Sequence, residues 1–426
     1  MAAFGFLDVA PLRASPGFRL LYAARAASFL AFGVLGVAVS LQTYALTDSS
    51  LQVALLNAAV AGPMALSLMV GGWLADRFDR RTVMVWSRTA HLAAILILMG
   101  NAALAEPGIL PIFAAAVVGG ATFGFGMPAL MAATPALVGR EHLAGAAALT
   151  AVAAQAGAIA GPFLAGAITA RMGLVACYGL VALASGLTPI LLARLPRLPP
   201  ARGEPGGDAP SDRTGGLRFL LRSPLVLNLL LIDLVALVFA VPYVLLPELA
   251  ARAFRGDADS LGLLYTAPAL GALIGALGSG RAGASPWAGR WLLACVAVWA
   301  GACLALGLVG GLVPALLVLA ILGAAASLAG ILRAALIQRA TPDAMLGRVS
   351  GLWVLEETLG PALGGMQMGT SAHLASARLA LVTGGGLCLA ATAGFAALIP
   401  SLRRASLAPE KRPETGHAGL VPADAR

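Results

Sequence analysis

The stretch that decides the fold of this 426-residue chain reads Gly71-Gly72-Trp73-Leu74-Ala75-Asp76-Arg77-Phe78-Asp79-Arg80-Arg81. Long apolar segments lie on both sides of it. Carboxylates and guanidiniums are costly in the hydrocarbon of a bilayer, so this cluster belongs where water is available. The stretch therefore predicts a tight turn at a membrane face that joins two membrane-spanning helices.

The composition of the whole chain agrees with a membrane protein. Hydrophobic residues make up 59% of it and charged residues 11%, and the mean hydropathy is +0.89. Soluble domains are about one quarter charged. The 52 glycines suit membrane helices that pack closely together. The composition predicts a protein that crosses the bilayer many times.

Apolar segments long enough to cross the bilayer recur along the chain, since about 20 residues suffice. We expect an all-α polytopic membrane protein with twelve transmembrane helices. The expected spans are 18–46, 51–75, 83–104, 109–135, 145–170, 173–194, 223–249, 260–280, 290–309, 312–338, 349–370 and 377–399.

The basic residues predict the orientation of these spans. Most of the 28 lie in segments that an even number of spans places on one face, and the opposite loops hold only Arg171, Arg252, Arg255 and Arg378. Lys and Arg concentrate on the cytoplasmic side of membrane proteins. We therefore expect both termini to be cytoplasmic. The same distribution accounts for the net charge of +9 without a nucleic-acid partner.

Short motifs recur at a nearly constant spacing, which predicts two halves with the same orientation. Ser15-Pro16 returns 208 residues later as Ser223-Pro224, and Ala133-Thr134-Pro135 returns as Ala340-Thr341-Pro342. The expected organisation is a six-helix half at 1–194, a flexible cytoplasmic linker at 195–222, a second six-helix half at 223–399 and a disordered cytoplasmic tail at 400–426.

The charged turn resembles the loop between helices 2 and 3 of the major facilitator superfamily, whose pattern is Gly-x-Leu-Ala-Asp-Arg-x-Gly-Arg-Arg. The resemblance implies a transporter that works by alternating access, with a conformational-switch loop formed by Gly72, Asp76, Arg77, Arg80 and Arg81. Asp76 is expected to hold the inner ends of helices together in one state. Asp79 stands where the family has a second glycine and is expected to tolerate replacement better.

A second motif resembles the antiporter signature of exporters in this superfamily. It is a helix-bend motif made of Gly157, Gly161, Pro162 and Gly166. Glycines four residues apart let a neighbouring helix approach closely, and the proline permits a bend. Ordinary tight packing is the alternative interpretation. The motif favours export over import.

Further stretches are similar to siderophore exporters of the superfamily. These are Phe18-Arg19, Arg25, 33–39, 68–77, 132–141, Gly262, Leu264-Tyr265, 341–348 and Gly351-Leu352-Trp353. The resemblance implies proton-driven export of a catecholate siderophore by an inner-membrane carrier whose partners are its small-molecule substrate, protons and the lipid bilayer. Multidrug and macrolide exporters share the same loops, so drug efflux is the alternative, and a metabolite importer is a further one. A monomer is expected.

Charges inside the spans are candidates for substrate and proton handling, because each is costly there. They are Arg25, Asp233, Arg333, Glu356 and Glu357. Arg25 and Asp233 are 208 residues apart and so occupy equivalent places in the two halves, where they are expected either to pair across the repeat axis or each to face a wet cavity. A snorkelling Arg25 and a locally satisfied Asp233 form the alternative. One of the two glutamates is expected to carry a proton, and the other to pair with Arg333 or Arg348.

Aromatic residues on the expected cavity-lining spans are weaker candidates for substrate contact. They are Tyr22, Phe29, Phe123, Phe125, Phe239 and Tyr243. The four cysteines are isolated, the four histidines are scattered, and no glycine-rich nucleotide loop with lysine is present. His91 lies in a span, where a packed neutral histidine is favoured over a proton carrier. We expect no metal, no cofactor and no enzymatic activity.

Overall fold

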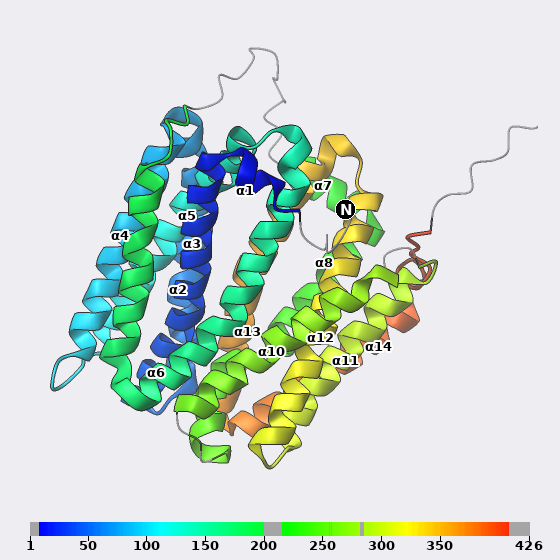
Figure 1. The fold of residues 1–426 in the computed structure, drawn as a ribbon. Coiled ribbons are helices and arrows are strands. Elements are labelled where there is room, and N and C mark those ends of the chain that lie inside the picture. The colour runs from blue at the N-terminus through cyan, green and yellow to red at the C-terminus, as the bar shows by residue number, and fades with distance from the viewer. Residues whose placement is uncertain (1–7, 200–214, 255, 257, 282–284, 409–426) are drawn as a thin grey trace, which may run out of the picture.

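The structure is a computed structural model that describes residues 8–199, 215–254, 256, 258–281 and 285–408. Its regular elements in this part of the chain are helices (Figure 1). Ten helical stretches are long and apolar enough to cross a membrane. The helices are α1 (Ala10–Ala14), α2 (Pro16–Thr47), α3 (Ser50–Arg77), α4 (Arg80–Ala102), α5 (Leu110–Leu137), η1 (Arg140–His142), α6 (Leu143–Ala193), α7 (Gly215–Arg222), α8 (Pro224–Phe239), η2 (Tyr243–Leu245), α9 (Leu246–Glu248), η3 (Leu249–Ala253), α10 (Ala258–Gly278), η4 (Ser279–Arg281), α11 (Ala288–Leu308), α12 (Leu312–Ala340), α13 (Asp343–Leu374), α14 (Ala377–Leu398) and α15 (Pro400–Arg403).

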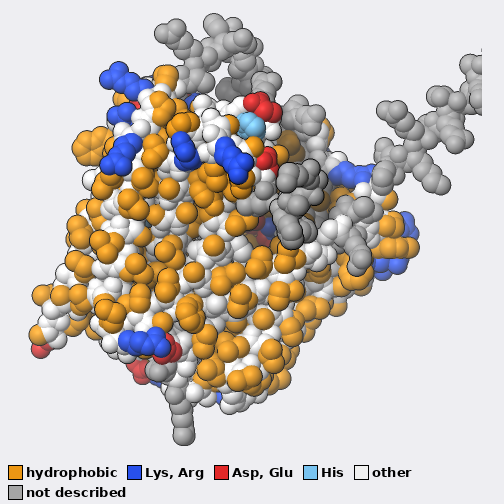
Figure 2. Space-filling model, viewed as in Figure 1, with side chains coloured by type: hydrophobic (Ala, Val, Ile, Leu, Met, Phe, Trp, Pro, Cys, Tyr) orange, Lys and Arg blue, Asp and Glu red, His pale blue; other side chains and the backbone are white. Residues whose placement is uncertain are grey.

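The surface divides into an apolar middle and charged ends. Figure 2 shows hydrophobic side chains over the middle of the molecule, with most of the visible Lys and Arg side chains at its two ends. The charged turn between α3 and α4 lies at one of these ends, which we call the turn end. We call the opposite end the latch end; it holds Asp48, Arg171, Arg252 and Asp259. Both described chain ends lie at the turn end (Figure 1).

Helix α6 is two limbs rather than one continuous helix. Its 51 residues contain Gly173, whose φ of 82° and ψ of 174° are not helical. Only glycine adopts such a backbone conformation at low cost. The first limb runs parallel to α2, because Gly157 meets Phe29 and Gly161 meets Gly33. The second limb runs antiparallel to α2, because Tyr178 bonds Gln42 whereas Thr188 lies beside Ser28. The expected spans 145–170 and 173–194 correspond to these limbs.

The expected span 223–249 is interrupted, which corrects the prediction of one continuous helix. Helix α8 ends at Phe239, and the chain is non-helical from Ala240 to Pro242 before η2 begins. Proline removes a backbone donor and clashes with the preceding turn, so Pro242 accounts for the break. The Trp299 indole Nε1 on α11 donates to the Ala240 carbonyl oxygen at 2.8 Å. This bond satisfies a carbonyl that would otherwise be unpaired within the membrane.

The helices pack in two groups that meet along two helix pairs. In the first group α2 packs on α6, α5 on α3 and α4, and α4 on α6. In the second group α12 packs on α10 and α11, α11 on α14, and α8 on α13 and α14. The groups meet where α6 packs on α10 and α3 on α13. The packing of α5 on α3 and α4 in the first group is repeated by α12 on α10 and α11 in the second.

The expected linker and tail contain more structure than the sequence indicates. Residues 215–222 form the short helix α7, and residues 400–403 form α15. Leu198, Leu402 and Ala405 are buried. The expectation of a polar, unstructured chain is therefore wrong for these parts, because their apolar side chains pack against the bundle. The expected linker residues 200–214 and tail residues 409–426 lie outside the described residues.

Candidate functional site

The second helix group holds a buried network of charges on three helices. Arg333 of α12 is 3% exposed and forms ion pairs with Asp233 of α8 and Glu357 of α13. The Arg333–Glu357 pair joins Nη2 and Oε1 at 2.8 Å. The Trp353 indole donates to the same Glu357 oxygen at 2.8 Å. A buried arginine requires such compensation, so this network joins α8, α12 and α13.

Glu356 lies beside this network without an ion-pair partner of its own. Both of its carboxyl oxygens are buried from solvent and lack a well-formed hydrogen bond to any described residue. Its neighbour Glu357 has a side chain that is 51% exposed. Successive helix residues point about 100° apart, which separates the two carboxylates. Of the two alternatives left open for Arg333 and Arg348, the structure pairs Glu357 with Arg333.

The expected pairing of Arg25 with Asp233 is wrong. Arg25 stays in its own helix group, where Nη2 donates to the Leu130 carbonyl oxygen at 2.7 Å and Nη1 to the Thr150 hydroxyl at 3.2 Å. Asp233 instead meets Arg333. The repeat offset aligns positions along two helices but says nothing about which way each side chain points around its helix axis.

Arg88 is a further buried charge, and it is missing from the charges expected inside the spans. It lies in α4 and is 8% exposed. Its guanidinium carbon lies 5.7 Å from the centre of the Phe32 ring and 5.5 Å from that of Phe123. No carboxylate among the described residues pairs with it. Its position eight residues into a helix that begins Arg80-Arg81 was the signal available in the sequence.

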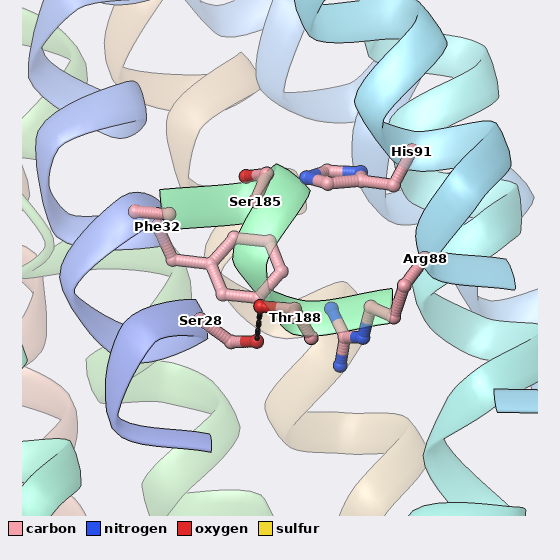
Figure 3. A pocket seen from close by; sticks show the side chains of 7 residues that line it. Ser28, Phe32, Arg88, His91, Ser185 and Thr188 are labelled. Atoms are coloured by element: carbon pink, nitrogen blue, oxygen red, sulfur yellow. Dashed lines mark hydrogen bonds between the residues drawn. The ribbon is translucent and has the colours of Figure 1, made fainter. Parts of the chain in front are cut away.

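Arg88 and His91 line a small cavity inside the first helix group (Figure 3). Both reach from α4 toward α2 and the second limb of α6, whose hydroxyls Ser28 and Thr188 lie 3.4 Å apart. The volume of this cavity is about 10 Å³. A water molecule needs about this much room. His91 Nδ1 is buried and has no hydrogen-bond partner among the described residues.

The structure does not gather the aromatic candidates into one site. Phe123 packs edge-on against Phe32 at 4.9 Å between ring centres. Tyr22 lies near Phe18 at 6.2 Å. Tyr243 stacks on Tyr265 at 6.3 Å. No two of the six candidate rings, which are Tyr22, Phe29, Phe123, Phe125, Phe239 and Tyr243, are in ring contact within the described part of the chain.

The helix-bend motif has two contact faces in the first limb of α6. Gly157 and Gly161 lie against Phe29 and Gly33 of α2, where an added Cβ would come within 2.6 Å of backbone. Gly166 instead faces α10, with Gly262 Cα 2.9 Å from the position of an added Cβ. Pro162 lies in the same limb. The motif therefore holds α6 against its own group on one face and against the other group on the second face.

The charged turn binds the chain that follows α6. Asp79 Oδ1 accepts from Thr82 N at 3.2 Å, and Oδ2 accepts from Leu198 N at 3.0 Å. Arg80 N donates to the Leu198 carbonyl oxygen at 2.9 Å, and Arg81 donates to that of Leu195 at 2.9 Å. Asp79 thus caps α4 and anchors the start of the expected linker.

The neighbouring Asp76 and Arg77 make fewer contacts. The Asp76 side chain is exposed and forms no hydrogen bond or ion pair with a described residue. The Arg77 guanidinium stacks over the Trp73 ring at 4.5 Å. Gly72 has open space where a Cβ would stand. The contacts of Asp79 argue against the expectation that it tolerates replacement better than Asp76.

Replacing Asp79 with alanine is expected to destabilise the protein, whereas Asp76→Ala is not. Loss of the cap costs about 1 kcal/mol, and the Leu198 amide loses its acceptor in addition. The thermal unfolding midpoint of each variant in detergent measures this. Equal midpoints for Asp79→Ala and the wild type would show that the capping contacts contribute nothing.

Polar contacts across the two helix groups gather at the latch end and reach only to mid-depth. Arg252 pairs with Asp48 at 2.5 Å, and Ser50 donates to Glu248 at 2.6 Å. Arg171 lies 3.9 Å from Asp259. Gln155 donates to the Ala269 carbonyl oxygen at 2.6 Å near the middle of the bundle. Within the described residues, the turn end has no such bond between the groups.

Comparison with known proteins assigns the family. Residues 7–420 match the family described as "Transmembrane secretion effector". The chain is 37% identical over 367 residues to the proteins called "Enterobactin exporter EntS" of Shigella boydii serotype 18 and of Escherichia coli O127:H6, covering 85% of this chain and 87% of each relative. The chain belongs to the transmembrane secretion effector family of the major facilitator superfamily, and the resemblance to its exporters is confirmed.

Solved structures share the fold at low sequence identity. A POT family transporter in complex with 5-aminolevulinic acid superposes with a TM-score of 0.71 at 11% identity, covering 91% of this chain and 97% of that one. The nucleoside transporter NupG superposes with a TM-score of 0.71 at 12% identity, covering 90% and 100%. These similarities show that the chain shares the fold of these proteins.

Proposed function

We propose that this chain exports a catecholate siderophore, enterobactin or a close relative, from the cytoplasm across the inner membrane in exchange for protons. The observation that carries the proposal is the 37% identity to enterobactin exporters across 85% of the chain. The two relatives named above share that description. The carrier works as a monomer with its substrate, protons and the bilayer as its only partners.

Twelve transmembrane helices in two parallel six-helix halves form the carrier. Residues 1–194 and 223–399 are the halves, joined by a cytoplasmic linker. The equivalent packing roles in the two helix groups support this division, and so do the two limbs of α6 and the 32-residue helix α13. Both termini and the charged turn face the cytoplasm, which makes the turn end the inner end.

The two halves have different electrostatic roles. Arg25 and Arg88 place two buried positive charges in the first half without a carboxylate partner among the described residues. Such charges favour an anionic ligand such as an ionised catechol. The second half holds three carboxylates around Arg333. We assign proton handling to that half, with Glu356 as the carrier of the proton.

The carrier alternates between states open to either side, and the described contacts suit one closed at its outer end. The latch bonds and the Gly166–Gly262 contact hold the halves together there. Proton uptake from outside and release inside then resets the carrier. The switch loop of Gly72, Asp76, Arg77, Arg80 and Arg81 acts at the inner end, where Asp76 gains a partner when that end closes.

Reporter fusions test the topology. A cytoplasmic reporter fused at residue 210 is expected to be active, and one fused at residue 257 is expected to be inactive, because 210 falls in the proposed cytoplasmic linker and 257 in the proposed outer loop. Measuring both with paired cytoplasmic and periplasmic reporters checks the assignment. An external reading at 210 would reverse the orientation and with it the direction of transport.

The outer latch is expected to be insensitive to pH between about 5 and 8. The neighbouring Tyr44 hydroxyl and Arg252 guanidinium lower the pKa of the Asp48 carboxyl below its usual range, which is about 3.9 in model peptides. A carboxylate with a lowered pKa stabilises the closed latch above the ordinary value and loses this effect only as the pH falls through the lowered value. The latch pair therefore does not carry the physiological proton coupling.

Spin labels at Leu46 and Leu374, two exposed positions beside the latch, measure this. In a Glu356→Gln background, the distance distribution is expected to be the same at both ends of that pH range, and Asp48→Asn is expected to shift it to longer distances. Opening of the latch on acidification in that background would contradict the assignment.

Secretion from cells tests the function itself. Deleting the gene is expected to remove one catecholate from the culture medium, and the wild-type gene is expected to restore it. Mass spectrometry of medium and cell extract measures both pools, since a blocked exporter leaves the siderophore inside the cell. Unchanged siderophore in the medium together with increased sensitivity to macrolides would favour drug efflux instead.

A further inference from the structure

Three arginines converge on a hollow at the turn end. This hollow lies apart from the Arg333 network and from the buried Arg25 and Arg88. Arg290 of α11, Arg403 of α15 and Arg404 line a space of about 490 Å³, together with Leu293 and Ala396. None of the three guanidinium groups forms an ion pair or a hydrogen bond with a described residue. Figure 2 shows basic side chains at this edge of the molecule, where Figure 1 draws α15. Three positive charges around one hollow favour an anionic occupant.

The hollow has a defined architecture. The Gly289 amide donates to the Ala405 carbonyl oxygen at 3.0 Å, and the Leu407 amide donates to that of Ser285 at 3.1 Å. A Cβ at position 289 would overlap the Leu402 carbonyl oxygen, so the close approach requires glycine there. Leu402 is fully buried beneath. These contacts fix the backbone that carries Arg403 and Arg404 against the start of α11.

The surroundings of the hollow are those of a membrane interface. Trp287 and Trp291 are 53% and 52% exposed, and the Arg290 guanidinium lies 4.3 Å from the centre of the Trp287 ring. Leu398, at the end of the last apolar span, is 82% exposed. Exposed tryptophans beside the ends of membrane helices lie at the level of lipid headgroups. The floor formed by Leu293 and Ala396 is apolar, as an acyl chain would require.

We propose that this hollow binds an anionic phospholipid, whose phosphate is held by Arg290, Arg403 and Arg404 and whose acyl chain lies along the neighbouring apolar surface. Arginine suits phosphate because its planar fork donates two parallel hydrogen bonds. Basic pockets between membrane helices bind anionic headgroups elsewhere. The general preference for positive charge on one side explains arginines at this end but not three that line one hollow. The site is independent of the transported substrate.

Lipid titration of the purified full-length chain tests the proposal. In phosphatidylcholine nanodiscs with an increasing share of phosphatidylglycerol, the thermal midpoint of the wild type is expected to rise. The variant R290Q/R403Q/R404Q is expected to lose that rise. The matched control R13Q/R19Q/R339Q removes three exposed arginines from the same end and is expected to keep it. Soluble glycerol phosphate is expected to raise no midpoint, which separates a lipid from a free phosphate.

Tryptophan quenching gives an answer that does not depend on folding of the triple variant. Brominated phosphatidylglycerol is expected to quench the wild type more strongly than brominated phosphatidylcholine does, and W287F/W291F is expected to remove that difference. Equal quenching by both lipids would overturn the proposal. An unchanged response to phosphatidylglycerol in the triple arginine variant would also overturn it, because the lipid would then act at another place on the protein.

Discussion

Replacing Arg333 with glutamine is expected to abolish export and to destabilise the second half strongly. Arg333 is 3% exposed and neutralises Asp233 and Glu357 at once. Removing one partner of a buried ion pair leaves the other charge uncompensated, which costs about 3–5 kcal/mol. Thermal unfolding in detergent and a siderophore secretion assay measure the two effects. The matched control is Arg339→Gln, which removes an exposed arginine from the same helix.

A double-mutant cycle separates this network from the pairing that the repeat suggests. Arg333→Gln combined with Asp233→Asn is expected to be less destabilised than the sum of the single variants, by about 0.5–3 kcal/mol. Arg25→Gln combined with Asp233→Asn is expected to be additive, because Arg25 bonds Leu130 and Thr150 instead. Coupling between Arg25 and Asp233, with none between Arg333 and Asp233, would refute the described arrangement.

Replacing Glu356 with glutamine is expected to abolish transport driven by a pH gradient while leaving the protein folded. Both carboxyl oxygens are buried next to the Arg333 network without a well-formed hydrogen bond to a described residue. We therefore assign the transported proton to this carboxyl group. Glutamine keeps the shape and the neutral form but releases no proton. Substrate exchange without a gradient is expected to continue in this variant.

The control for Glu356 is its neighbour in the chain. Glu357 is half-exposed and is held by Arg333 and Trp353. Glu357→Gln is therefore expected to lower stability while keeping the response to the pH gradient, because Asp233 still neutralises Arg333. Measuring accumulation with and without a gradient in both variants distinguishes the roles. Loss of coupling in Glu357→Gln alone would move proton handling to Glu357.

The sequence predicts the elements that depend on local composition. The turn at Asp76 to Arg81 lies between two long helices as expected, because charged side chains between two apolar spans are costly in the bilayer core and therefore lie at the membrane surface. The apolar spans coincide with helices to within a few residues. The helix-bend motif predicts that neighbouring helices approach Gly161 and Gly166 closely, and the structure has both contacts. The break after Phe239 was also detectable, since Pro242 lies inside the expected span.

The partners of the charges were not predictable, because they depend on how each helix is rotated and on the path of distant segments. Asp233 meets Arg333 rather than Arg25 because α8 turns its carboxylate toward α12. Asp79 binds Leu198, which is 119 residues away in the chain. The position of Arg88 within the helix was visible in the sequence, but its packing against Phe32 and Phe123 was not.

Flux into proteoliposomes tests the central claim most directly. Liposomes with the cytoplasmic side of the carrier facing outward and an acidic lumen are expected to accumulate enterobactin. This accumulation is expected to cease when the pH gradient is dissipated. The Glu356→Gln protein is expected not to accumulate it. Accumulation of a macrolide but not of enterobactin, or accumulation of enterobactin that ignores the gradient, would contradict a proton-coupled siderophore exporter.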